Sequence, residues 1–138
     1  MEWFLKVVRD NYSNFNGRAQ RKEYWMFYLF YMIFSIIAAV ADNILGTVFT
    51  VGEGPYAVGI GYGWIYVLLI IALFIPTLAV GVRRLHDIGK SGWWLLIMLI
   101  PCAGPIWLLV LTCTDSNPGE NEYGPSPKTS TVLEEKTA

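Results

Sequence analysis

Three long stretches of this sequence contain no charged side chain: 24–41, 54–82 and 91–114. A helix that spans a membrane needs ~20 predominantly apolar residues, and each stretch supplies such a segment. Backbone groups in lipid must satisfy their hydrogen bonds within the segment, so each stretch is expected to be helical. The stretches lack the alternation of a barrel strand and are too long for one. The sequence therefore predicts an all-α integral membrane protein with about three transmembrane helices, near 24–45, 62–82 and 92–114.

The composition narrows the class of protein further. Hydrophobic residues make up 54% of the 138 residues and charged residues 15%, against ~25% charged residues in soluble domains. A soluble chain of this length cannot bury so much apolar surface. The net charge of −1 argues against nucleic acid as a partner. We expect one membrane domain, 1–125, and a disordered polar tail, 126–138.

The first residues form a pattern of their own. One face of a helix over 2–12 would carry Trp3, Phe4, Val7, Val8 and Tyr12. The opposite face would carry Glu2, Lys6, Arg9 and Asp10. This pattern predicts an N-terminal amphipathic helix that lies in the membrane interface. A helix that docks on the protein itself would show the same pattern.

Basic residues near the ends of the uncharged stretches predict the orientation of the chain. The N-terminal segment carries Lys6, Arg9, Arg18, Arg21 and Lys22. The first loop has no Lys or Arg, and the second has Arg83, Arg84 and Lys90. Because cytoplasmic loops are enriched in Lys and Arg, the N-terminus and the second loop are expected on the cytoplasmic side of the membrane.

The third stretch leaves the position of the C-terminus open. Pro101 and Pro105 interrupt it, and proline can either kink a helix or allow a turn. A kinked span, which is the preferred interpretation, would place the C-terminus outside the cell. A re-entrant hairpin would return the C-terminus to the cytoplasm.

Two polar motifs flank the first two spans on the same predicted side. Two antiparallel helices would place both motifs at one membrane depth, so the acids are expected to pair with the arginines. Unpaired arginines would remain available for lipid phosphates. The candidate polar cluster at the cytoplasmic interface consists of Arg18, Arg21, Glu23, Arg83, Arg84, His86 and Asp87.

The motifs contain no recognisable catalytic or metal-binding set. His86 and Asp87 are adjacent in sequence, and adjacent side chains seldom face each other as a catalytic pair must. One histidine and two cysteines do not supply the four ligands of a structural zinc site. We therefore assign no catalytic residue, cofactor or metal ligand.

Three sequence blocks carry a resemblance to a known family: 15–25, 83–94 and 119–125. In these blocks the chain resembles the domain of unknown function 805 (DUF805) family, the YhaH/YhaI-type bacterial inner membrane proteins. The resemblance implies a small multi-pass inner membrane protein and implies no activity, substrate or catalytic residue.

Three functional hypotheses follow from these features. The first is a non-enzymatic membrane module whose basic cytoplasmic face engages anionic lipid headgroups, protein partners or further copies of the chain. The second is a membrane-embedded enzyme acting on a lipid headgroup through Arg83, Arg84, His86 and Asp87. The third is a pore, which would have to be oligomeric because three helices cannot enclose a lumen alone.

Overall fold

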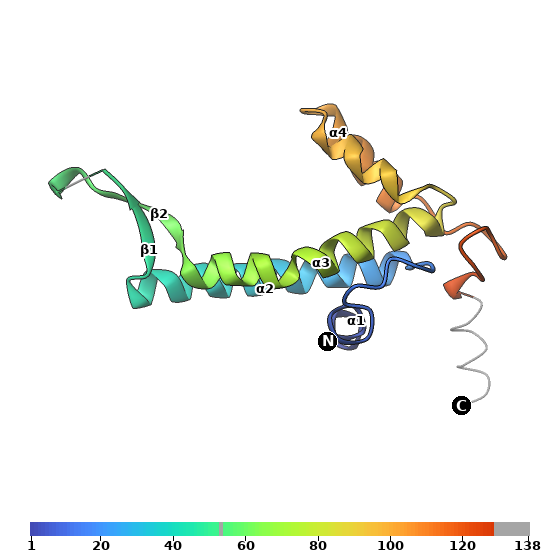
Figure 1. The fold of residues 1–138 in the computed structure, drawn as a ribbon, viewed down its shortest axis with the longest axis horizontal. Coiled ribbons are helices and arrows are strands. Elements are labelled where there is room, and N and C mark those ends of the chain that lie inside the picture. The colour runs from blue at the N-terminus through green and yellow to red at the C-terminus, as the bar shows by residue number, and fades with distance from the viewer. Residues whose placement is uncertain (53, 129–138) are drawn as a thin grey trace. The chain divides into compact units, whose positions relative to one another are not determined.

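The computed structural model describes residues 1–52 and 54–128. The chain forms two compact units. The first combines Met1–Phe27 with Pro76–Ala138, and the second is Tyr28–Ile75. Two long helices, α2 (Arg21–Leu45) and α3 (Trp64–Asp87), each contribute residues to both units (Figure 1).

Helices α2 and α3 are long and apolar enough to cross a membrane. Their lengths, 25 and 24 residues, exceed the ~20 residues that a span needs. Only 17% and 28% of their most apolar segments are buried within the structure, whereas the core helix of a soluble protein is mostly buried. The structure thus agrees with two of the three predicted spans.

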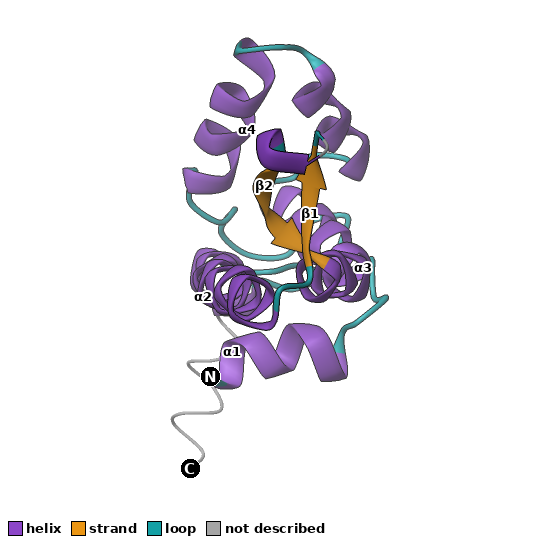
Figure 2. Cartoon of the chain, turned by 90° about the vertical axis from the view of Figure 1, so that its left-hand side faces the viewer, coloured by secondary structure: helices purple, strands orange, loops and turns teal. Residues whose placement is uncertain are grey.

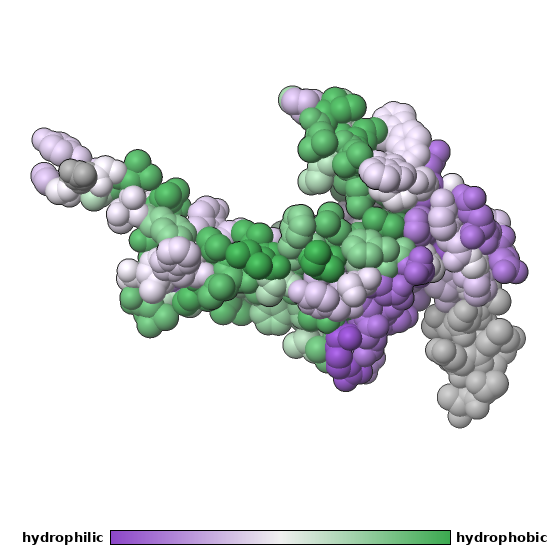
Figure 3. Space-filling model, viewed as in Figure 1, coloured by the Kyte–Doolittle hydropathy of each residue, from purple (hydrophilic) through white to green (hydrophobic). Residues whose placement is uncertain are grey.

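The third uncharged stretch forms a helical hairpin. It consists of a 3-10 helix, η3 (Gly92–Leu99), and an α-helix, α4 (Ala103–Cys113). Each arm rises ~16 Å, about half of the ~30 Å hydrocarbon thickness. The two arms pack against each other, and their surface is mainly hydrophobic (Figures 1 and 3). The predicted third span is therefore wrong, and the hairpin alternative describes the structure.

The reversal between the two arms has a local cause. Proline lacks an amide donor, so Pro101 cannot continue a regular hydrogen-bond ladder, whereas Pro105 lies in the first turn of α4, where proline is tolerated. Cys102, between them, has a φ of 63°, a left-handed conformation that stops a helix. The amide of Gly104 then donates to the Ile100 carbonyl at 3.0 Å, which begins α4 close to η3.

The chain is mostly helical, as predicted, but the first loop contains a small β-hairpin that the all-α prediction did not include. Strand β1 (Val48–Val51) pairs antiparallel with β2 (Val58–Gly63), and a 3-10 turn, η2 (Gly54–Tyr56), lies between them (Figure 2). The sequence Val-Phe-Thr-Val of β1 is rich in the β-branched and aromatic residues that favour strands. Gly52 and Gly54 have positive φ values of 95° and 61°, which glycine adopts readily at a turn.

Helix α2 continues past the first uncharged stretch and includes Asp42. Asp42 lies within the predicted helix near 24–45, and its side chain is fully buried. Its carboxylate accepts hydrogen bonds from the amides of Gly63, Ile65 and Tyr66 at 3.0, 3.1 and 2.9 Å, and from the Thr47 hydroxyl at 2.5 Å. Asp42 therefore caps the N-terminus of α3, whose first amides have no partner within the helix.

The N-terminal segment is helical and docks on the chain. Helix α1 (Glu2–Leu5) continues into a π-helical segment, η1 (Lys6–Asp10). Phe4 and Val7 are buried, and the Phe4 ring stacks on the Phe27 ring with 5.6 Å between centroids.

Most of the predicted disordered tail, 129–138, lies outside the described residues. Within 126–128, Ser126 is buried and Lys128 forms an ion pair with Asp115.

Candidate functional site

Arg18 joins the end of α3 to the C-terminal segment. Its Nε donates to the Asp87 carboxylate at 3.0 Å, and both side chains are almost completely buried. The other guanidinium nitrogens donate to carbonyl oxygens of Asp87 (3.2 Å), Asn117 (2.6 Å), Gly119 (2.7 Å) and Gly124 (3.2 Å). Arg18 therefore connects its own segment to the end of α3 and to the C-terminal segment 117–124.

Arg84 caps the C-terminal end of α4. Its Nε donates to the Thr112 carbonyl at 3.0 Å, and its Nη2 donates to the Thr114 carbonyl. Carbonyls at a helix C-terminus have no partner within the helix and carry the negative end of its dipole. The Nη1 of Arg84 also donates to Asp87, and to the Ala19 carbonyl at 3.4 Å. Both ends of the hairpin, η3 and α4, thus return to the Asp87 end of α3.

Glu23, in the first turn of α2, forms a second group of ion pairs, with Arg83 and Lys6. It accepts a hydrogen bond from Nη1 of Arg83 at 2.7 Å and lies 3.5 Å from the Lys6 ammonium. Glu23 and Arg83 are 2% and 4% exposed, whereas Lys6 is 48% exposed. Arg83 Nε and Nη2 are buried and have no hydrogen-bond partner among the described residues.

His86 contacts the third sequence block. Its ring stacks on the Tyr123 ring with 3.8 Å between centroids and 3° between planes. Its Nδ1 lies 3.3 Å from the Gly17 carbonyl, and because a carbonyl only accepts, this geometry places the proton on Nδ1. The Asn121 amide donates to the His86 carbonyl at 3.0 Å.

Five of the seven candidate residues are buried and ion-paired, in two groups that are together called the buried ionic cluster: Arg18, Asp87 and Arg84 in one, Glu23 and Arg83 in the other. Arg21 is not part of it, because its side chain is 44% exposed and pairs with Asp115 at 3.1 Å. The carboxyl of Asp115 also accepts a hydrogen bond from Lys128, which lowers its pKa below the ordinary value.

Sequence reasoning missed the C-terminal contribution to the cluster. Block 119–125 was part of the family resemblance, and it supplies two of the carbonyls that bind Arg18. The resemblance of this block was the available signal. Its contacts with Arg18 are made by backbone atoms, which side-chain patterns do not report.

The geometry favours a structural role for the cluster over catalysis. Arg84 and Asp87 are fully buried, and each bonds to several partners. Neither presents a group to a substrate. Within the described ranges, no three His, Cys, Asp or Glu side chains are grouped so that they could hold a metal ion.

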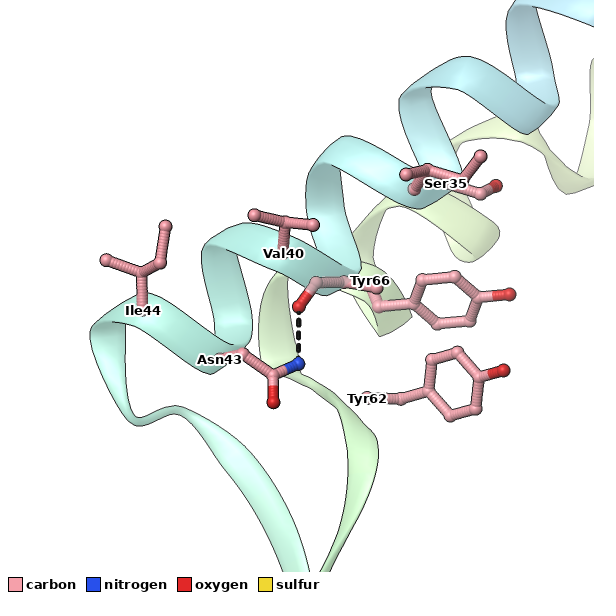
Figure 4. Close-up of a pocket in the computed structure, with 8 residues that line it drawn as sticks. Ser35, Val40, Asn43, Ile44, Tyr62 and Tyr66 are labelled. Carbon is pink, nitrogen blue, oxygen red and sulfur yellow. Dashed lines mark hydrogen bonds between the residues drawn. The ribbon is translucent and has the colours of Figure 1, made fainter.

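The second unit contains a shallow groove of about 540 Å³. It is lined by Ser35, Ile36, Ala39, Val40, Asn43, Ile44, Tyr62 and Tyr66. Figure 4 shows the hydroxyls of Tyr62 and Tyr66 pointing to the same side. The Asn43 amide donates to the carbonyls of Ala39 (2.7 Å) and Gly61 (3.1 Å). The lining contains no Asp, Glu, His, Lys or Arg side chain.

Comparisons with known proteins agree with the resemblance. A family model described as "Protein of unknown function (DUF805)" matches residues 12–125. The chain is 44% identical to "Inner membrane protein YhaH" of Escherichia coli (strain K12), over 93% of this chain and 98% of that protein. It is 43% identical to "Inner membrane protein YhaI" of the same organism, over 93% and 97%. No solved structure matches significantly. The resemblance drawn from the three blocks is confirmed, and the chain belongs to the DUF805 family.

Proposed function

We propose that this chain is a non-enzymatic module of the bacterial inner membrane that engages anionic lipid headgroups through a basic cytoplasmic face. Pairs of lysine and tryptophan are the observation that carries the proposal. The ammonium groups of Lys6 and Lys22 lie 5.3 and 5.5 Å from the centroid of the Trp3 ring. The Lys90 ammonium lies 4.9 Å from the Trp94 ring.

Such pairs suit the surface of a membrane. Tryptophan favours the headgroup level, and a nearby lysine can reach the phosphates of anionic lipids. All three lysines lie outside the uncharged stretches. Because Arg83 and Arg84 are buried, the proposal assigns the attraction of the protein surface to anionic lipid to the three lysines.

Selectivity for anionic lipid tests this proposal. We expect phosphatidylglycerol to raise the thermal midpoint of the purified protein more than phosphatidylcholine does. The combined variant Lys6→Gln, Lys22→Gln and Lys90→Gln should lose that difference, because each lysine near the surface adds attraction to anionic lipid. Lys128→Gln is the control, since Lys128 pairs with Asp115 and belongs to no lysine–tryptophan pair. An equal response of the wild type to both lipids would contradict the proposal.

The proposal includes an orientation in which the N-terminus, the second loop and 115–128 are all cytoplasmic. It rests on the distribution of Lys and Arg and on the hairpin, whose two ends lie at the same end of α3. In this orientation the β1–β2 hairpin faces the periplasm.

Cysteine labelling in spheroplasts tests the orientation. In a background with Cys102 and Cys113 replaced by serine, an impermeant reagent should label Tyr56→Cys from outside. It should label Ser13→Cys and Glu120→Cys only after permeabilisation. All three positions are exposed. Labelling of Glu120→Cys from outside would mean that the third stretch crosses the membrane.

A further inference from the structure

The charges of the buried ionic cluster do not balance. Three arginines share two acids, and the other hydrogen-bond acceptors are unevenly distributed among the arginines. Asp87 serves Arg18 and Arg84, and both arginines also donate to several carbonyl oxygens. Glu23 serves Arg83 but also pairs with Lys6. Each acid is thus shared by two basic side chains, but Arg18 and Arg84 have further acceptors, whereas Nε and Nη2 of Arg83 have none among the described residues.

Arg83 also has one complete edge of its guanidinium free. Its Nη1 bonds to Glu23 at 2.7 Å, while Nε and Nη2 have no partner in the part of the chain that the structure describes. Nε and Nη2 form the edge that can bind two oxygens of one carboxylate or phosphate at once. The Arg83 side chain is only 4% exposed, and buried charged donors without partners are strongly unfavourable.

We infer that the free edge of Arg83 binds one oxyanion of the phosphate class. Arg83 directly follows the uncharged stretch 54–82, which places it near the headgroups, where phosphate oxygens are abundant. The source of the oxyanion could be a phospholipid or free phosphate, and both present the same pair of acceptor oxygens. A lipid source rests on the proposed function, whereas the pairing of Arg83 with an oxyanion rests on the structure alone.

Binding measurements on the full chain in a maltoside detergent, which contains no phosphate, test this inference. The thermal midpoint is followed while inorganic phosphate, phosphatidylglycerol or phosphatidylcholine is added at constant ionic strength. We expect saturable binding at one site. Arg83→Lys keeps the charge but loses the two-pronged edge, so it should weaken binding about tenfold or more. Arg21→Lys is the control, because Arg21 is exposed and pairs with Asp115.

Glu23→Gln should change the affinity in the opposite direction. Removing the acid that competes for Arg83 increases the surplus charge, so the oxyanion should bind more tightly even though the fold loses an ion pair. A purely structural cluster would lose stability in both variants with no change in affinity. If a variant does not fold, the side-chain NMR signals of ¹⁵N-labelled arginine in the wild type provide the test, and one Nε signal should shift with added ligand.

The outcomes separate the two proposals. Binding of lipid alone identifies a lipid phosphate, and binding of inorganic phosphate as well shows that the free ion suffices. Equal binding of both lipids that depends on Arg83 supports the site and contradicts the anionic selectivity of the proposed function. Affinities that are unchanged in Arg83→Lys, or no shifted Nε signal, would overturn the inference.

Discussion

Asp87→Asn is expected to lower the free energy of unfolding by about 3–5 kcal/mol, the range for breaking a buried ion pair by removing one partner. The Asp87 carboxylate accepts from Arg18, Arg84 and Ser116. An asparagine has one acceptor oxygen and turns an amide donor toward an arginine. Two buried guanidinium groups would then share an incomplete set of acceptors.

The same substitution should loosen the C-terminal segment. The Asn117 amide bonds to the Asp87 carbonyl at 3.0 Å, and Arg18 holds the carbonyls of Asn117 and Gly119. Hydrogen exchange over 117–124 should therefore accelerate.

Asp115→Asn is the matched control for Asp87→Asn. The side chain of Asp115 is 58% exposed, and exposed ion pairs contribute little to stability. Equilibrium unfolding in mixed micelles would measure both variants. A loss in Asp87→Asn no larger than that in Asp115→Asn would show that the buried ionic cluster does not hold the fold together.

The sequence was sufficient to predict the first two spans and the pairing across them. Length and the absence of charge identify a candidate span, because the hydrocarbon thickness sets the number of residues needed. Charges at one membrane depth must pair or reach water, so arginines were expected to meet Glu23 and Asp87. The structure contains Arg18–Asp87 and Arg83–Glu23 pairs at 3.0 and 2.7 Å.

Features that depend on backbone geometry could not be predicted in this way. Hydropathy cannot distinguish a span from two short apolar arms, because both avoid charge over the same length. Asp42 lies beyond the uncharged stretch, and only the approach of the amides at the start of α3 makes its burial favourable. The acceptors for Arg18 and Arg84 are mostly carbonyl oxygens, which every residue carries.

Gly104→Ala is expected to open the helical hairpin. A Cβ atom at this position would lie 1.9 Å from the Ile97 carbonyl oxygen and 3.2 Å from Met98 Cα. These are backbone atoms of η3, so the contact cannot be relieved by rotating a side chain. We expect a loss of about 1–3 kcal/mol or more in the free energy of unfolding, the range for overpacked sites, and faster exchange of the backbone amide of residue 104 than in the wild type.

Gly81→Ala is the matched control, because Gly81 lies on α3 and faces the same hairpin. A Cβ atom there would meet the Leu95 side chain at 3.2 Å, and the end of a leucine can move. Alanine also favours a helix over glycine by ~1 kcal/mol, so this variant should unfold no more easily than the wild type. Equal stability of the two variants would mean that η3 and α4 are not held in close backbone contact.

Combining Gly104→Ala with Glu120→Cys then links packing to orientation. If the close contact at Gly104 keeps the third uncharged stretch folded as a hairpin, an impermeant reagent should label residue 120 from outside the cell in part of the population. The reason is that η3 and α4 together, once separated, have the length of a single span.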